Sequence, residues 1–506
     1  MDHQKAMQRL EAIDREQVLI SHISGVLVWD QEVVPPAGHE ERAKQLGLLD
    51  RKMHEMVVSD EMGQLLQVLG ASDTNPEGTA DLDERSRALV RSYYRSWRRA
   101  SRLDADFVQR FSELTSQAHQ VWAHARSEDD FSLYEPVLSQ IVQMVQEKAQ
   151  RYGYTDDPYD ALLEVFEPGT TTAEVELLFN EMQRDIQDVL SVIRGSQREV
   201  EDSFLYSSYP VDKQALFARD ILDAMGFDWS RGISGTATHP FTISLGSDDV
   251  RITSRYSEPS VTSPLYSSIH EGGHALYEMG ASNDVTRGTS LANGASLAFH
   301  ESQSRLWENM IGRSESFWER FYPRFQHLFP LQLDGVDEKM FYRAVNRVQP
   351  SCIRVDADEV TYGLHIILRF RLERQLLAGT LSVRDLPGAW NDAMEELIGI
   401  RPTSDREGVL QDVHWSMGEL GYFPTYALGN LYGAQILHAM KKDLDVDAVV
   451  STGDFSPIKN WLHAKILRFG TIYEPKDLLR KVTGSTLDAR YFREYLHTKY
   501  IGSESL

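Results

Sequence analysis

The stretch His270-Glu271-Gly272-Gly273-His274 carries the side chains whose types and spacing point most directly to chemistry. On a helix, residues four apart lie on the same face, so His270 and His274 can direct both imidazoles at one point. Zinc binds such nitrogens at about 2.0–2.1 Å. Glu271 lies roughly 100° round the helix from His270. It can therefore stand beside a bound metal and accept a proton from a metal-bound water.

The same five residues could instead be polar surface on an exposed helix, so the flanking sequence has to decide. Ile269, Leu276 and Met279 form an apolar stripe, which indicates a packed helix. Gly272 and Gly273 weaken a helix by about 1 kcal/mol each relative to alanine. Glycines kept in such a place usually mark the close approach of another element. A buried helix with two histidines needs polar partners for them, and a metal supplies those partners.

A catalytic zinc site needs a third protein ligand and keeps its fourth position for water. The next predicted helix, residues 296–311, contains Glu301, which is the natural candidate. His300 and Glu308 compete with it for this role. Glu308 lies two helical turns, about 10 Å, from Glu301, so we expect only one of the two carboxylates to reach the metal.

Two later segments carry further candidate groups. Arg354 opens an apolar helix predicted to run to Gly379, and its guanidinium is the best bidentate partner for a carboxylate. It could also simply pair with Asp358, one turn along. A predicted loop at residues 408–429 contains His414, Tyr422 and Tyr426. Donors on such a glycine-rich segment suit stabilisation of a tetrahedral oxyanion.

The remaining sequence predicts a mainly helical fold with one small β element. Helices are predicted at roughly residues 2–29, 39–69, 82–100, 104–125, 134–152 and 172–194. The pattern changes at residues 236–257, where segments 239–245 and 250–256 alternate as a β-hairpin does. No repeat or flexible linker appears, so we expect a single integrated unit over 1–506. Residues 1–235 would form an N-terminal helical half and residues 236–506 a catalytic half.

Composition restricts the class of partner and the compartment. The chain has 506 residues, and 76 acidic against 52 basic side chains give a formal net charge of −24. Such a surface repels nucleic acid and anionic membranes. A single cysteine, Cys352, excludes internal disulfides and fits a reducing compartment. Neither a signal sequence nor a run of transmembrane length is present. The sequence thus predicts a soluble, cytoplasmic protein with no nucleic-acid partner.

Several of these motifs occur in one order along nearly the whole chain. They are Trp29-Asp30 before a proline pair, His239-Pro240-Phe241, HEGGH at 270–274, HESQ at 300–303, IRVDAD at 353–358 and GVLQDVHW at 408–415. In this combination the chain resembles the carboxypeptidase Taq family of metallocarboxypeptidases.

The resemblance implies an elongated multi-helix fold with a deep central groove, often as a homodimer. It implies release of C-terminal residues from peptides with broad preference, using one divalent metal, usually zinc and in some members cobalt. By the same matching, His270, His274 and Glu301 are similar to the family's metal ligands and Glu271 to its catalytic base. Arg354 looks like the group that binds the substrate's C-terminal carboxylate. His414, Tyr422 and Tyr426 resemble substrate- and transition-state-binding groups of the related gluzincins.

Two other functions remain open at this point. One is an endo-acting oligopeptidase of the related helical gluzincins, which would not require a free C-terminal carboxylate. The other is a helical scaffold whose site has decayed. The intact glutamates at 271 and 301 count against the scaffold, and turnover with bound metal would dismiss it.

Overall fold

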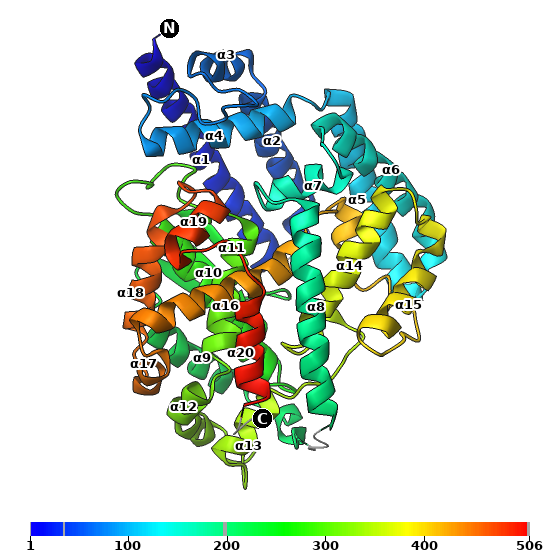
Figure 1. Ribbon diagram of the computed structural model, residues 1–506, viewed down its shortest axis with the longest axis vertical. Helices are drawn as coiled ribbons and strands as arrows, with labels where there is room; N and C mark the ends of the chain where they lie inside the picture. Colours follow the sequence, from blue (N-terminus) through cyan, green and yellow to red (C-terminus); the bar gives the residue numbers. More distant parts are fainter. Residues whose placement is uncertain (1, 34–35, 196–199, 503–506) are drawn as a thin grey trace. The chain divides into compact units, whose positions relative to one another are not determined.

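The computed structural model describes residues 2–33, 36–195 and 200–502. Within these ranges the chain forms 20 α-helices, short 3-10 turns and one three-stranded sheet (Figure 1). The predicted mainly helical class with a small sheet near the HEGGH helix is confirmed. Over the same ranges, no helix combines the length and the apolar character needed to cross a bilayer.

The chain divides into two compact units, each made of three chain segments. Residues 1–101, 201–345 and 436–486 form unit 1, and residues 102–200, 346–435 and 487–506 form unit 2. The change of pattern expected near residue 236 falls inside one segment of unit 1. A single integrated unit over 1–506 stays a prediction.

Unit 1 holds the sheet and most of the helices before and after it. Its helices are α1 (His3–Val33), α2 (His39–Val57), α3 (Asp60–Val68), α4 (Glu84–Ala100), α9 (Val211–Met225), α10 (Thr262–Ala281), α11 (Leu297–Arg305), α12 (Glu315–Leu328), α13 (Glu338–Val345), α17 (Val446–Thr452), α18 (Ser456–Lys465) and α19 (Pro475–Thr483). A π-helical segment, η4 (Leu306–Ile311), continues α11 directly.

Unit 2 is helical apart from its loops and turns. Its helices are α5 (Ala105–Glu128), α6 (Glu135–Tyr152), α7 (Pro158–Phe166), α8 (Thr172–Gly195), α14 (Tyr362–Leu377), α15 (Leu386–Leu397), α20 (Arg490–Tyr500) and the part of α16 (Pro424–Asp443) up to Gln435. The 3-10 turns η5 (Arg354–Asp356) and η7 (His414–Met417) also belong to it.

The helix predicted over residues 39–69 is in fact two helices, α2 and α3. Ser59 is extended, with φ −62° and ψ 148°, and its hydroxyl accepts from the backbone N–H of Met62 at 3.2 Å. A serine side chain in this position satisfies a backbone donor at the start of a helix. The apolar periodicity continues across the break, which is why the sequence pattern alone did not reveal it. Helices α7 and α9 were also absent from the predicted ranges.

The predicted hairpin is confirmed as strands β2 (Thr242–Gly246) and β3 (Asp249–Ser254), which pair antiparallel. The sequence analysis missed β1 (Gly232–Thr236), which pairs parallel with β3 and gives the sheet order β1-β3-β2. Its sequence, GISGT, contains a single large apolar residue and so lacks the alternation by which strands are recognised. Helix α10 packs against this sheet, with α9 and α11 beside it.

An aromatic core beneath α10 fixes its position in unit 1. Trp318 of α12 lies 4.4 Å from Phe341 and 5.6 Å from Phe325, measured between ring centroids. The Trp318 indole N–H donates to the hydroxyl of Tyr266 on α10 at 3.2 Å. Buried aromatic pairs of this kind contribute about 0.5–1.5 kcal/mol each beyond their burial. The core therefore holds the helix that carries both histidines.

Candidate functional site

Helix α10 places His270 and His274 on one face, as their spacing predicted. Most residues of the helix are buried, including Ile269, Leu276 and Met279 of the apolar stripe. The alternative of a polar surface helix is therefore wrong. The two imidazole rings lie 4.8 Å apart, nearly perpendicular to each other.

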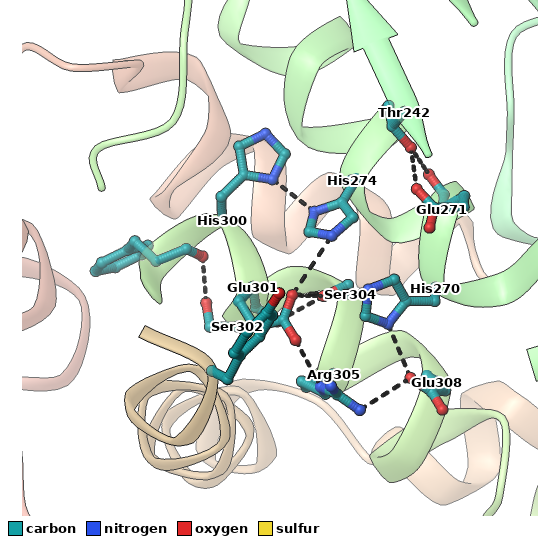
Figure 2. A network of polar contacts seen from close by, with 12 residues as sticks. Thr242, His270, Glu271, His274, His300, Glu301, Ser302, Ser304, Arg305 and Glu308 are labelled. Carbon is teal, nitrogen blue, oxygen red and sulfur yellow. Dashed lines mark hydrogen bonds and ion pairs between the residues drawn. The ribbon is translucent and has the colours of Figure 1, made fainter. Parts of the chain in front are cut away.

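Glu301 of α11 completes a group of three donor atoms. Its Oε2 lies 3.6 Å from Nε2 of His270 and 3.5 Å from Nε2 of His274 (Figure 2). Among the described residues, these three side chains form one group whose ligand atoms all lie within 4.8 Å of one another. Ligands at zinc-binding distances on a tetrahedron are separated by roughly 3.3–3.4 Å. Two imidazole nitrogens and one carboxylate oxygen therefore fit a zinc-like cation in both type and spacing.

The two competing residues contact the far sides of the histidine rings. Glu308 Oε2 lies 2.8 Å from Nδ1 of His270, and Nδ1 of His300 lies 2.6 Å from Nδ1 of His274. The expectation that only one of the two carboxylates joins the metal-binding group agrees with this arrangement, although Glu308 also lies against His270. Glu301 and Glu308 approach opposite nitrogens of one imidazole, so both can touch His270 while only one joins the three-donor group.

Arginines compensate the charge of the buried carboxylates. Arg305 donates from Nε to Glu301 Oε1 at 2.7 Å and from Nη1 to Glu308 Oε2 at 3.4 Å. Burial raises the pKa of both carboxyls, but Arg305 and the histidines outweigh burial. They hold the pKa of Glu301 well below its usual range and lower that of Glu308 to about 2. Both side chains therefore stay ionised.

Burial also acts on the two histidines, with different results. It lowers the pKa of His274 to about 3, so this imidazole is neutral and has a lone pair to offer. For His270, burial lowers the pKa, but the charges of Glu301 and Glu308 outweigh it and raise the value. A cation in the group would repel a proton from both rings.

Glu271 lies beside the three-donor group, and a residue of the sheet holds its carboxylate in place. Thr242, the first residue of β2, donates its hydroxyl to Glu271 Oε2 at 2.6 Å (Figure 2). Burial raises the pKa of Glu271. The sequence analysis missed Thr242, although it directly follows the His239-Pro240-Phe241 motif that it had identified.

In unit 2, Arg354 is buried and pairs with Asp412. Its Nε and Nη2 donate to Asp412 Oδ1 at 3.1 and 2.8 Å, and its Nη1 donates to the Tyr362 hydroxyl at 3.1 Å. The expected pairing with Asp358 is wrong. Asp358 Oδ1 accepts from the backbone N–H groups of Val360 and Thr361, because a single turn η5, and no continuous helix, separates it from Arg354.

A second buried guanidinium, Arg369 of α14, shares the same carboxylate. Its Nε donates to Asp412 Oδ2 at 2.7 Å and its Nη2 donates to Gln411 at 2.8 Å. Burial raises the pKa of Asp412, but the two arginines hold it well below its usual range. One carboxylate thus balances two guanidiniums. The sequence analysis missed Arg369, since an arginine on a helix is ordinary without the fold.

His414, Tyr422 and Tyr426 lie together in unit 2. The His414 ring centroid lies 5.4 Å from that of Tyr422, and the two tyrosine rings lie 5.3 Å apart. His414 Nε2 is 3.4 Å from the Tyr426 hydroxyl. Burial lowers the pKa of His414 to about 4, so this histidine is neutral. The predicted loop over 408–429 is partly wrong, because Tyr426 lies in the first turn of α16.

Glu373 of α14 holds this segment in place. The fully buried carboxylate accepts from the Trp415 indole N–H at 2.7 Å, the Tyr159 hydroxyl at 2.6 Å and the backbone N–H of Gly421 at 3.1 Å. Burial raises its pKa to about 7.

The predicted site residues lie in both units. The metal-binding candidates and Glu271 belong to unit 1, and Arg354 and the histidine–tyrosine group belong to unit 2.

Known proteins share this chain's sequence and fold over nearly its full length. The thermostable carboxypeptidase 1 of Pyrococcus furiosus is 39% identical over 493 residues, 95% of this chain and 96% of its own. That of Thermus thermophilus is 37% identical over 514 residues, 99% of each chain. The crystal structure of the M32 carboxypeptidase from Deinococcus radiodurans R1 has a TM-score of 0.92 at 36% identity, covering 97% of this chain and 98% of the other.

A solved structure of the Pyrococcus furiosus carboxypeptidase has a TM-score of 0.93 at 38% identity, covering 97% of this chain and 98% of the other. The family model described as carboxypeptidase Taq (M32) metallopeptidase matches residues 9–500. Because this family model covers nearly the whole chain and the relatives are 37–39% identical over almost their full length, the chain belongs to the carboxypeptidase Taq (M32) family of metallopeptidases.

Proposed function

We propose that this chain releases C-terminal residues from peptides, with broad preference, by metal-assisted hydrolysis at the group formed by His270, His274 and Glu301. Family membership makes it a metallocarboxypeptidase, a hydrolase acting on peptide bonds. The observation that carries the proposal is the convergence of three donor atoms within 4.8 Å, with the Glu271 carboxylate beside them. In a scaffold that had lost its activity, we would not expect the three donor atoms and the adjacent carboxylate to remain together.

His270 Nε2, His274 Nε2 and Glu301 Oε2 would hold one divalent cation, for which we propose zinc, with cobalt as the alternative. Nitrogen and carboxylate donors are the set that catalytic zinc uses. When bound, such a cation polarises the scissile carbonyl and lowers the pKa of water. The ionised state of Glu301 and the neutral state of His274 suit both residues to the role.

Glu271 would act as the general base and then the general acid. It takes a proton from the attacking water and gives it to the leaving amine. Thr242 fixes the carboxylate through Oε2, so we assign the proton transfers to Oε1. Because burial raises the pKa of Glu271, its carboxylate is a stronger base than an exposed glutamate.

Tyr422, Tyr426 and the neutral His414 would donate hydrogen bonds to the tetrahedral oxyanion and to the substrate. Removing one such donor typically costs about 2.7–4 kcal/mol of transition-state stabilisation. Their mutual ring contacts, and the anchoring of the segment by Glu373, keep these donors in fixed positions.

Arg354 would bind the C-terminal carboxylate of the substrate. Its three side-chain hydrogen bonds among the described residues use three of the five N–H donors of a guanidinium. Among the described residues, Asp412 forms the ion pairs of both Arg354 and Arg369, so one buried carboxylate faces two positive charges. Burying an unbalanced charge is costly, and an incoming carboxylate would relieve that cost.

The test of exopeptidase action compares matched peptides with free and amidated C-termini. The parent enzyme should cleave the free peptides and act poorly on the amidated ones. Arg354→Ala should lower kcat/KM for free peptides about tenfold to hundredfold or more, because each charge-assisted bond is worth about 1.5–3 kcal/mol. The metal should stay bound, and amidated peptides should be affected much less.

Arg371→Ala serves as the control, since this arginine lies on α14 with a third of its side chain exposed. Equal losses on both peptide classes would make Arg354 a structural ion-pair partner. Efficient cleavage of amidated peptides by the parent enzyme would favour an endo-acting oligopeptidase.

The family resemblance further predicts a homodimer, and the single cysteine a cytoplasmic location. The excess of acidic side chains argues against a nucleic-acid partner. Peptides with a free C-terminus are therefore the partners that we propose.

A further inference from the structure

We propose that His300 and Glu278 are positioning residues that fix the tautomer of His274 and thereby set the affinity of the metal site. The inference rests on the proposed role of His274 as a ligand. It concerns two side chains outside the three-donor group, one on α11 and one on α10.

A chain of short polar contacts leads away from the three-donor group. His274 Nδ1 lies 2.6 Å from His300 Nδ1, and His300 Nε2 lies 2.7 Å from Glu278 Oε1. Figure 2 draws the first of these contacts as a dashed line. Glu278 follows His274 by one turn of α10, so both ends of the chain belong to the same helix. The His300 and Glu278 side chains are only 15% and 13% exposed. Little solvent is present to replace these contacts.

The proton positions follow from the acceptor at the end of the chain. A carboxylate oxygen accepts hydrogen bonds, so Glu278 receives the Nε2–H of His300. In that tautomer His300 has its lone pair on Nδ1 and accepts the Nδ1–H of His274. His274 Nε2 is left with its lone pair, and this atom is the one 3.5 Å from Glu301.

The surroundings hold the His300 ring in this orientation. Tyr277 lies against it with a centroid distance of 5.0 Å. Gly294 leaves room on another side, since a Cβ there would come within 2.7 Å of His300 Cδ2. His270 is supported differently, by direct contact with Glu308. The two ligand histidines thus have distinct supports, and that of His274 passes through an imidazole.

Paired amide substitutions separate this role from simple space filling. The Oδ1 of asparagine is the same number of bonds from Cα as Nδ1 of histidine, whereas Nε2 of glutamine matches Nε2. His300→Asn therefore keeps an acceptor for His274, and His300→Gln keeps only the contact with Glu278. Zinc affinity of the metal-free protein, measured by competition with a chelating dye, is the readout.

We expect His300→Gln to weaken zinc binding about 10–100-fold, the usual effect of losing such a partner. His300→Asn should stay within a few-fold of the parent. The visible spectrum of the cobalt-substituted protein should change in the glutamine variant and not in the asparagine variant. Equal losses in the two variants, or none in either, would overturn the proposal.

Glu278→Ala tests the other end of the chain and does not alter His300. It should also weaken zinc binding, because His300 is then free to adopt the other tautomer. Combined with His300→Gln it should add nothing, since the link is already broken. Additive losses would contradict the coupling. If the parent protein bound no zinc at all, the proposed function would fail first, whereas a parent that binds zinc with unaffected variants would refute only this inference.

Discussion

Two carboxylates contact His270 from opposite sides of its ring, and only one of them belongs to the three-donor group. Glu301 faces Nε2 and Glu308 faces Nδ1. The spacing along the helix indicated that both could not join one group of metal donors, and only Glu301 lies in the three-donor group. It did not indicate that the second would support the histidine, because a sequence does not say which nitrogen an acid approaches. Such carboxylate–histidine pairs orient the ligand and raise its basicity.

At the same scale, Glu271→Gln tests the assignment of the base. The amide oxygen can still accept from Thr242, so the local structure should persist. It cannot take a proton from water, and loss of general-base catalysis should lower kcat about 10²–10⁴-fold. Zinc content, measured by elemental analysis, should be unchanged. Near-normal turnover in this variant would remove Glu271 from the mechanism.

At the scale of elements, the two glycines of the HEGGH helix prove to do different things. A Cβ on Gly273 would stand 2.8 Å from Ser304 Cα and 2.9 Å from the Gln303 carbonyl oxygen, both backbone atoms of α11. A Cβ on Gly272 would meet the side-chain ends of Leu222 and Met225. The prediction that a helix glycine marks a close approach is confirmed, and at Gly273 that approach brings Glu301 to the histidines.

Gly273→Ala should therefore push α11 away from α10 and disturb Glu301. We expect it to destabilise the protein by about 1–3 kcal/mol, as overpacking does, and to lower zinc content. Gly272→Ala is the matched control, since flexible side chains can move and alanine favours a helix by about 1 kcal/mol. Thermal unfolding and metal analysis of both variants check this. Equal stability and zinc content in the two variants would show that the packing of α10 on α11 does not depend on the close approach at Gly273.

Glu373 links α7, α14 and the segment before α16, and its pKa, raised from 4.5 to about 7, makes that link pH-dependent. The folded state binds the proton more tightly than the unfolded state, so the stability is full below pH 4.5 and falls as the pH rises to about 7. The loss amounts to about 3 kcal/mol. The Glu373→Gln variant has no carboxyl to titrate at this position, so it should lack this loss of stability.

Urea unfolding midpoints of the parent protein and of Glu373→Gln, measured at about pH 5 and pH 8, test this prediction. From pH 5 to pH 8 the midpoint of the variant should rise relative to that of the parent. The exposed Glu396 on α15, changed to glutamine, is the control and should leave the pH dependence as it is. If the unfolding midpoints of Glu373→Gln and the parent changed equally with pH, the Glu373 carboxyl would have an ordinary pKa in the folded protein.

Elements with strong periodicity were predictable from the sequence, and those set by tertiary contacts were not. Helix α10, the hairpin and the grouping of Glu301 with His270 and His274 followed from spacing and motif order. Strand β1 has too few apolar residues to be recognised, and it forms because β3 offers it an edge. Arg354 was assigned the wrong partner because Asp412 is distant in the chain, and only folding brings it near.

At the scale of the whole molecule, the two units are interleaved along the chain. Each is built from three segments, whereas the expected N-terminal and catalytic halves are contiguous, and that division stays a prediction. Changes in composition or periodicity along a sequence mark only contiguous regions, so they do not reveal a unit that is built from separate segments. Contacts between distant segments decide compactness, and the absence of a linker was the only signal that the sequence offered.

The central claim is that one cation, held by His270, His274 and Glu301, is required for release of C-terminal residues. Zinc titration of the chelated protein, followed by turnover of a peptide with a free C-terminus, tests it most directly. Activity should be absent without metal, rise linearly and saturate at about one equivalent per chain, with the fold retained throughout. In Glu301→Ala the curve should shift to much higher zinc. Full turnover by the metal-free protein, or an unchanged curve in Glu301→Ala, would contradict the account.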